Sequence, residues 1–375
     1  MFVETQKYLH ALVERKCIPY LDVCAYKDHK ELWRWYGGDG RESVTGTEKI
    51  LLYSATKPIT AVCAMRLFED GKLSLDDAVE KWLPAYKDAF ILDEKGNICA
   101  PTTKMRIRHL LTMSAGITYD YASYPIAETI AENAGKEDTQ TIVGAYIKKP
   151  LAFEPGERFQ YSLCHDVLAA VIERASGESF SNYMRKIVFE PLGMTRSNFP
   201  NNMSGIAAQY TCLNEGNITK DLKEDPFWFR FGKDYESGGA GVASTMEDYI
   251  RFADTLACGG ESVNGYRLLK EGTIKELYQQ QLPSITIKNS FWCVQGGDYG
   301  YGMGVRTRME ATEWGLPKGE FGWDGAAGSY LMVDPVHHIS IVITMHLTAW
   351  PNTFIGEHLQ IVEKIYRELS EREVI

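Results

Sequence analysis

Apolar and polar residues alternate in two pairs of segments, one pair near each end of the chain. Residues 21–26 and 31–36 flank a short polar loop, and residues 329–334 and 339–345 flank a turn at Pro335. Alternation with a period of two puts every second side chain on the same face of a strand. Each pair of segments therefore predicts a β-hairpin.

Apolar residues at helical spacing occupy both chain ends and the middle. Residues 1–14 and 355–369 each predict an amphipathic helix. We expect an α+β fold in which these helices flank an antiparallel sheet. The sheet domain is built from residues 1–100 and 236–375, and a mainly helical domain is inserted at 101–235, with the active site at the junction. The helices of this insertion are expected at 107–113, 128–134, 141–147, 166–175 and 180–188.

Composition and charge exclude several classes of protein. The chain has 375 residues, of which 45% are apolar and 24% charged, as in a globular protein of about two structural units. Its net charge of −10, without a basic cluster, argues against a nucleic-acid partner. No apolar stretch approaches the roughly 20 residues that span a bilayer. Residues 1–14 lack the features of a secretory signal, so we expect a cytoplasmic protein unless the chain is a processed form.

The cysteines and histidines give no pattern typical of a metal site. Eight cysteines are scattered without short paired spacing, and no His-Glu-x-x-His sequence occurs. In a chain without a signal, such cysteines are expected to be reduced core residues rather than disulfides or metal ligands. We therefore expect neither a metal nor another cofactor.

Residues 53–57, Tyr-Ser-Ala-Thr-Lys, carry the strongest candidate chemistry. Ser54 lies three positions before Lys57, at the expected start of a helix over residues 58–68. Residues three apart share a helix face, so the two side chains would meet there. Serine becomes nucleophilic only beside a base, and a lysine serves as that base when burial or nearby cations lower its pKa. The pair predicts a serine nucleophile that attacks a carbonyl.

Two further segments could complete such a site. Tyr161 lies just before the helix expected at 166–175, and it could act as an acid or base if Lys57 lowers its pKa; a packed aromatic is the alternative. Residues 321–328 are rich in glycine at the start of a strand, which lets the backbone approach a ligand. A backbone amide there could form an oxyanion hole together with the amide of Ser54. The alternative is an ordinary glycine-rich start of a strand with a packed tryptophan.

Together the three segments resemble the signature of the serine β-lactamase and penicillin-binding protein superfamily, and most closely its class C branch and the class C-like (family VIII) esterases. The resemblance continues in residues 73–84, 109–116, 191–194 and 238–249, which follow the family order and extend it over the whole chain. It implies a β-lactamase/transpeptidase-like fold and catalysis without a cofactor.

The resemblance also implies a role for each matching residue. Ser54 would be the nucleophile, Lys57 the general base, and Tyr161 the acid and base that protonates the leaving group and later helps water attack the acyl-enzyme. The oxyanion hole would be formed by the backbone amides of Ser54 and Ala326.

The sequence departs from the lactamase pattern at positions that contact substrate in the family. Leu163 stands where many relatives have an asparagine, and Trp323 stands where lactamases carry a lysine or histidine; both changes point away from penicillins and toward carboxylic esters or related acyl compounds. Asp324 replaces the usual glycine, and we expect its charge to disfavour anionic substrates. Gly325 completes this substrate-binding segment.

Other features leave alternatives open. The aromatic segments 118–124, which includes Tyr119, and 226–231 could line an acyl or alcohol pocket, or they could pack between the domains. Asp166 is expected to be structural and His165 partly exposed. Besides an esterase, the sequence allows an amidase, a D-amino-acid peptidase or β-lactamase, an acylating sensor without turnover, or an inactive scaffold.

Overall fold

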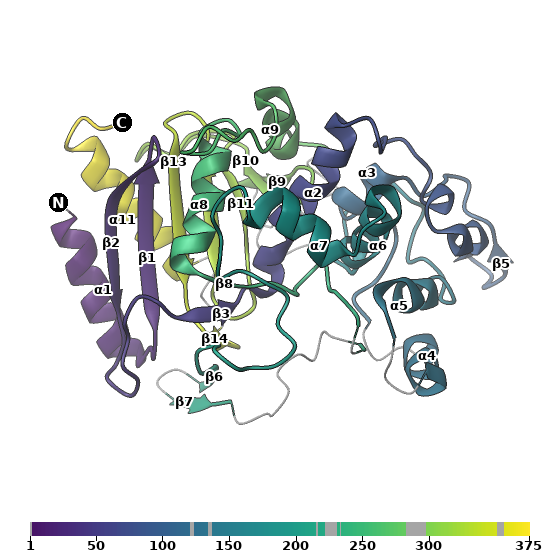
Figure 1. Ribbon diagram of the computed structural model, residues 1–375, viewed down its shortest axis with the longest axis horizontal. Coiled ribbons are helices and arrows are strands. Elements are labelled where there is room, and N and C mark those ends of the chain that lie inside the picture. The colour runs from purple at the N-terminus through teal and green to yellow at the C-terminus, as the bar shows by residue number, and fades with distance from the viewer. Residues whose placement is uncertain are drawn as a thin grey trace.

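Strands from both ends of the chain form one sheet. The computed structural model describes residues 2–120, 124–133, 137–214, 217–221, 231–232, 234–282, 298–350 and 356–375. Its main sheet has seven strands in the order β2-β1-β13-β12-β11-β10-β9, and the neighbouring strands are antiparallel (Figure 1). These strands are β1 (Leu21–Lys27), β2 (Lys30–Gly37), β9 (Tyr299–Tyr301), β10 (Arg306–Arg308), β11 (Phe321–Asp324), β12 (Tyr330–Asp334) and β13 (Ile339–Thr344).

Both predicted hairpins are confirmed, and the pairing of β1 with β13 joins them. Cys24 of β1 lies opposite Val342 of β13, so segments from near the two chain ends pair as the second and third strands of the sheet. All six residues of β13 are buried, which agrees with its uninterrupted apolar sequence. The predicted α+β fold with an antiparallel sheet is therefore confirmed.

Helices cover both faces of the sheet. On one face, α1 (Val3–Lys16) packs beside α11 (His358–Ser370), and the Thr5 hydroxyl donates a 2.8 Å hydrogen bond to Glu368. On the other face lies α8 (Met246–Ala257), which contacts β13 (Figure 1). Ile341 and Ile343 belong to the core under α1 and α11, whereas Val342 belongs to the second core, as expected for alternating side chains.

A helical region lies beside the sheet and continues its second core. Helix α2 (Lys57–Glu69) packs against α6 (Cys164–Ser176) and links the two parts (Figure 1). The five helices predicted between 101 and 235 are confirmed with shifted ends; the division into domains stays a prediction. Within the described residues, the remaining helices are α3 (Ile107–Leu111), α4 (Tyr124–Asn133), α5 (Thr139–Tyr146), α7 (Phe180–Met184) with a π-helical turn (Arg185–Phe189), α9 (Glu271–Tyr278), and the 3-10 turns η1 (Tyr53–Thr56), η2 (Val79–Lys81) and η3 (Pro84–Asp88).

Short strand pairs connect these parts, and β3 (Lys49–Leu51) with β8 (Ala243–Thr245) leads directly into η1. Across the part of the chain that the structure describes, no helix combines the length and the apolar character needed to cross a membrane. The other short strands are β4 (Ile91–Leu92), β5 (Ile98–Cys99), β6 (Tyr210–Asn214), β7 (Asn217–Lys220) and β14 (Leu347–Thr348).

Candidate active site

Ser54 lies in the tight turn η1, immediately before α2 begins at Lys57. The turn starts with a left-handed residue, Tyr53, whose φ is 49°. This conformation costs a residue with a large side chain about 1 to 3 kcal/mol and persists only where the surroundings impose it. The buried Tyr53 hydroxyl donates a 2.5 Å hydrogen bond to Gln209, and the Leu52 amide donates to the Val242 carbonyl. The surrounding structure thus fixes the backbone beneath Ser54.

Lys57 is fully buried, and its amine contacts the serine. Nζ donates hydrogen bonds to Ser54 Oγ at 3.1 Å and to the Gly239 carbonyl at 2.8 Å. Burial lowers the pKa of Lys57 to about 7, against the opposing effect of the nearby Asp166 carboxylate and the Cys164 thiol. A lysine of this pKa is largely neutral just above pH 7, which is the form that can accept a proton.

Three aromatic side chains surround this pair. Lys57 Nζ lies 4.7 Å from the centre of the Tyr161 ring, and the Tyr161 hydroxyl accepts a 3.3 Å hydrogen bond from Trp323 Nε1. The Tyr119 ring stacks on that of Tyr161 with centroids 5.4 Å apart, and its hydroxyl is hydrogen-bonded to Ser54. Burial raises the pKa of Tyr119 well above its ordinary value, so its hydroxyl stays protonated. The structure therefore brings Ser54, Lys57, Tyr161, Trp323 and Tyr119 together.

The prediction that Asp324 presents a charge to the substrate is wrong. Successive residues of a strand point to opposite faces, so Asp324 points away from Trp323 and shares a face with its cross-strand partner Tyr330, which lies in the core under α11. Its carboxylate accepts a 3.1 Å hydrogen bond from Arg306, and only 9% of its side chain is exposed. Burial raises the pKa of Asp324 to about 6, opposed by Arg306. This ion pair is an internal feature of the sheet.

Gly325 and Ala326 follow β11 directly beside the Ser54 turn. A side-chain carbon on Gly325 would lie 2.0 Å from the Leu52 carbonyl oxygen, so only glycine allows this close approach. Ala326 is exposed, and within the described residues its amide donates no hydrogen bond. An amide left available near Ser54 is what an oxyanion hole requires, and this role of Ala326 stays a prediction.

Leu163 lies in the buried core against which Tyr119 and Tyr161 pack. Leu163 is 3% exposed and packs in the core of the helical region, where it lines a small pocket with Ile117, Tyr146 and Lys149. Its packing gives no support to the predicted contact with substrate. The aromatic segment at 226–231 lies outside the described residues except for Phe231, and residues 121–123 of the first aromatic segment do so as well.

Sequence reasoning missed how Asp166 supports the lysine. The Asp166 carboxylate accepts hydrogen bonds from the Tyr235 hydroxyl at 2.5 Å and from the Ser237 hydroxyl at 2.6 Å. It also accepts from the amide of Gly239, whose carbonyl holds Lys57. Asp166 thus positions the loop that binds Lys57, a stronger role than the structural one expected for it. In the sequence, the adjacent glycines at 238 and 239 were the signal that the backbone passes close to other groups at this point.

The expected partial exposure of His165 is wrong, because its side chain is fully buried. Burial lowers the pKa of His165 well below its ordinary value, so it stays neutral. A side-chain carbon on Gly304 would lie 2.8 Å from its Nε2, which shows how closely the chain packs around the ring.

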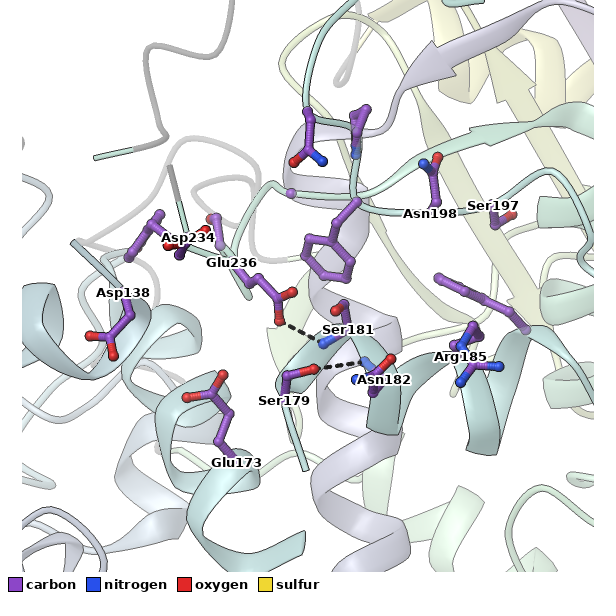
Figure 2. Close-up of a pocket in the computed structure, with 17 residues that line it drawn as sticks. Asp138, Glu173, Ser179, Ser181, Asn182, Arg185, Ser197, Asn198, Asp234 and Glu236 are labelled. Atoms are coloured by element: carbon purple, nitrogen blue, oxygen red, sulfur yellow. Dashed lines mark hydrogen bonds between the residues drawn. The ribbon is translucent and has the colours of Figure 1, made fainter. Parts of the chain in front are cut away.

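A separate pocket of about 560 Å³ adjoins the loop that holds Lys57 (Figure 2). Tyr235 and Ser237 line this pocket, but the catalytic candidates Ser54, Lys57 and Tyr161 do not. Figure 2 shows that Glu236 bridges to α7, where it accepts a 2.7 Å hydrogen bond from the Ser181 amide. Because it lacks a nucleophile candidate, this pocket is not the candidate active site.

Comparisons with known proteins identify a family and several relatives. The Beta-lactamase family model matches residues 5–363. The chain is 29% identical to the lovastatin esterase of Penicillium rubens over 243 residues, which cover 62% of this chain and 60% of that protein. It is 32% identical to esterase EstB of Burkholderia gladioli over 154 residues, or 40% and 38% of the two chains.

The fold also matches a solved structure. EstCE1, described as a hydrolase with promiscuous acyltransferase activity, superimposes with a TM-score of 0.78 at 24% identity, covering 96% of this chain and 97% of its own. Because the family model spans nearly the whole sequence, the chain belongs to the beta-lactamase family.

Proposed function

We propose that this protein is a serine hydrolase that cleaves carboxylic esters, or related acyl compounds, through an acyl-enzyme. The observation that carries the proposal is the fully buried Lys57 amine 3.1 Å from the Ser54 hydroxyl. A serine alone is a weak nucleophile at neutral pH, whereas a serine that gives its proton to a neutral amine can attack an ester carbonyl.

The acylation step follows from these contacts. Neutral Lys57 accepts the Ser54 proton while Oγ forms a bond to the carbonyl carbon, and the amides of Ser54 and Ala326 stabilise the oxyanion. Collapse of the tetrahedral intermediate breaks the ester bond. Tyr161 gives its proton to the departing alkoxide and regains one from the Lys57 ammonium, whose nitrogen lies 4.7 Å from its ring centre.

Hydrolysis of the acyl-enzyme uses the same groups in the opposite direction. As the water oxygen attacks the acyl carbon, Tyr161 accepts a proton from the water and passes its own proton to neutral Lys57. Collapse of the tetrahedral intermediate then breaks the bond to Ser54, whose oxygen takes its proton from the Lys57 ammonium. The hydrogen bond from Trp323 to the Tyr161 oxygen would stabilise the transient phenolate that forms after Tyr161 gives its proton to the alkoxide and before Lys57 returns one.

The surroundings of the site favour a neutral substrate. Trp323 presents an indole where lactamases carry a cation, and the charges of Asp324 and Arg306 compensate each other inside the sheet. A substrate carboxylate would therefore gain no ion pair from this strand. The esterases among the relatives support the same substrate class.

The test is steady-state and burst kinetics with p-nitrophenyl butyrate, with nitrocefin in parallel. We expect steady ester hydrolysis that is abolished in Ser54→Ala and unchanged in the control Ser43→Ala, whose serine is exposed outside the site. Intact mass after brief mixing should show one acyl group, lost in Ser54→Ala. A single burst without turnover would instead indicate an acylating sensor, and faster turnover of nitrocefin than of the ester would indicate a β-lactamase.

A further inference from the structure

A second cluster of reactive side chains lies where the turn between β1 and β2 meets the end of α8. The turn residues Asp28 and His29 both have left-handed backbones, with φ of 49° and 65°. This conformation aims His29 at α8: its amide donates to Asp254 Oδ1 at 3.1 Å, and its Nδ1 lies 2.7 Å from Asp254 Oδ2. The imidazole and the carboxylate are therefore held in direct contact.

A thiol completes the cluster. Cys258 caps the end of α8 four residues after Asp254, so the two side chains share a helix face. Cys258 Sγ lies 3.9 Å from Asp254 Oδ1, and one ligand atom from each of His29, Asp254 and Cys258 lies within 4.8 Å of the others. The sequence predicted no metal ligands because His29 is more than 200 positions away from the other two.

We propose that His29, Asp254 and Cys258 form a binding site for Zn²⁺. An imidazole nitrogen, a carboxylate oxygen and a thiolate sulfur form a mixed donor set that suits Zn²⁺, whereas Mg²⁺ and Ca²⁺ require oxygen ligands. Ligand atoms around one Zn²⁺ lie about 3 to 4 Å apart, so the cluster is close to the required size. Small side-chain rotations that separate His29 from Asp254 would admit the ion.

The surroundings supply a fourth coordination position. Cys258 lines a pocket of about 530 Å³ together with Glu271 and His338, so a water molecule can reach the ion from this side. Asp254 is almost buried, with 6% of its side chain exposed, whereas 28% of the His29 side chain is exposed. Binding replaces the Cys258 thiol proton, which passes to solvent, and it uses the neutral imidazole of His29 with its coordinating nitrogen unprotonated.

The position of the site indicates a structural effect. The ion would join the β1–β2 turn to α8, and α8 contributes Tyr249, whose hydroxyl donates a 2.7 Å hydrogen bond to the Ala55 carbonyl beside the nucleophile. None of the ligands belongs to the Ser54 site. We therefore expect Zn²⁺ to stabilise the fold and to leave the chemical step of ester cleavage unaltered, and the site does not depend on the proposed function.

The test is titration of the chelator-treated, full-length protein with ZnCl₂ by calorimetry and with CoCl₂ by absorption. We expect one ion per chain and a thiolate-to-cobalt charge-transfer band, because only a cysteine ligand produces that band. Cys258→Ser should remove the band, and His29→Asn, which tolerates the left-handed backbone, should weaken Zn²⁺ binding about tenfold or more. The matched control is Cys99→Ser, a partly exposed cysteine outside the cluster, which should leave both signals unchanged.

Two results would overturn the proposal. The first is the absence of stoichiometric Zn²⁺ binding or of the thiolate band in the unaltered protein, which needs no variant and does not depend on how well a variant folds. The second is binding that persists unchanged in both Cys258→Ser and His29→Asn, since the ion would then lie elsewhere. Zn²⁺ should also raise the melting temperature of the unaltered protein but not that of Cys258→Ser.

Discussion

The charge on Lys57 sets the pH range in which the proposed mechanism can operate. Burial lowers its pKa from the ordinary 10.5 to about 7. The difference corresponds to about 5 kcal/mol less favourable protonation than in water. Because only the neutral amine accepts the Ser54 proton, we predict that kcat/KM for p-nitrophenyl butyrate rises with pH, with a midpoint near pH 7, and levels off about one pH unit higher.

Replacing Asp166 with asparagine should move this rise to lower pH. A side-chain carbon on Gly239 would lie 2.7 Å from Asp166 Oδ2 and 3.4 Å from Lys57 Nζ. The oxygen and the nitrogen are therefore at most 2.7 + 3.4 = 6.1 Å apart. At an effective dielectric constant of about 20, opposite charges about 6 Å apart attract by roughly 3 kcal/mol, or about two pH units. Without this attraction the ammonium is less stable, so the midpoint should fall toward about pH 5.

The assay is the pH dependence of kcat/KM in Asp166→Asn and in a control, Asp138→Asn. Asparagine keeps an oxygen that accepts from Tyr235 and Ser237, and Asp138 is an exposed helix cap at which asparagine is equally suitable. The control should follow the profile of the unaltered enzyme. An unchanged profile in Asp166→Asn would refute the reasoning, because Asp166 would then carry no charge while Lys57 titrates. A shift of the midpoint to higher pH would show that the Asp166 side chain lowers the pKa of Lys57 instead of raising it.

Three further predictions concern the same site. Lys57→Met should abolish activity, yet its free energy of unfolding, measured with urea, should be up to roughly 4 kcal/mol higher than that of the unaltered protein at pH 7. This difference should shrink as the pH rises toward 10.5, because the lysine of the unfolded protein also loses its proton there. Tyr161→Phe should keep the fold by circular dichroism but lower kcat by roughly 10²- to 10⁴-fold, and near-normal turnover would exclude the tyrosine as acid and base. Gly325→Ala should lower the free energy of unfolding by about 1 to 3 kcal/mol, unlike the control Ala326→Gly, because the added carbon meets the Leu52 carbonyl; equal thermal stability would contradict that contact.

Local sequence patterns determined much of the architecture and the central pair of the candidate site. The period-two segments predicted both hairpins, and helical spacing predicted α1 and α11. Ser54 and Lys57 meet because residues three apart lie on one side of a helical turn, whether its first part is α-helical or, as here, a 3-10 turn. Such relations depend only on backbone geometry, so the sequence alone carries them.

The tertiary structure decided which side chains face the site and which are buried away from it. Asp324 follows Trp323 directly, yet strand alternation and the pairing of β11 with β12 send it to the opposite face, where it meets Arg306. Likewise, Asp166 acts on the lysine both by its charge and through the loop around Gly239, which it holds in place.

The sequence by itself therefore determined the fold class and predicted the candidate reacting groups, because helices, hairpins and the spacing of Ser54 and Lys57 depend on local backbone geometry. Only the tertiary structure decided the burial that lowers the pKa of Lys57, and only it brought His29 to Asp254 and Cys258. The physical reason is that desolvation and side-chain contacts depend on which distant segments pack together, and no local pattern specifies that packing.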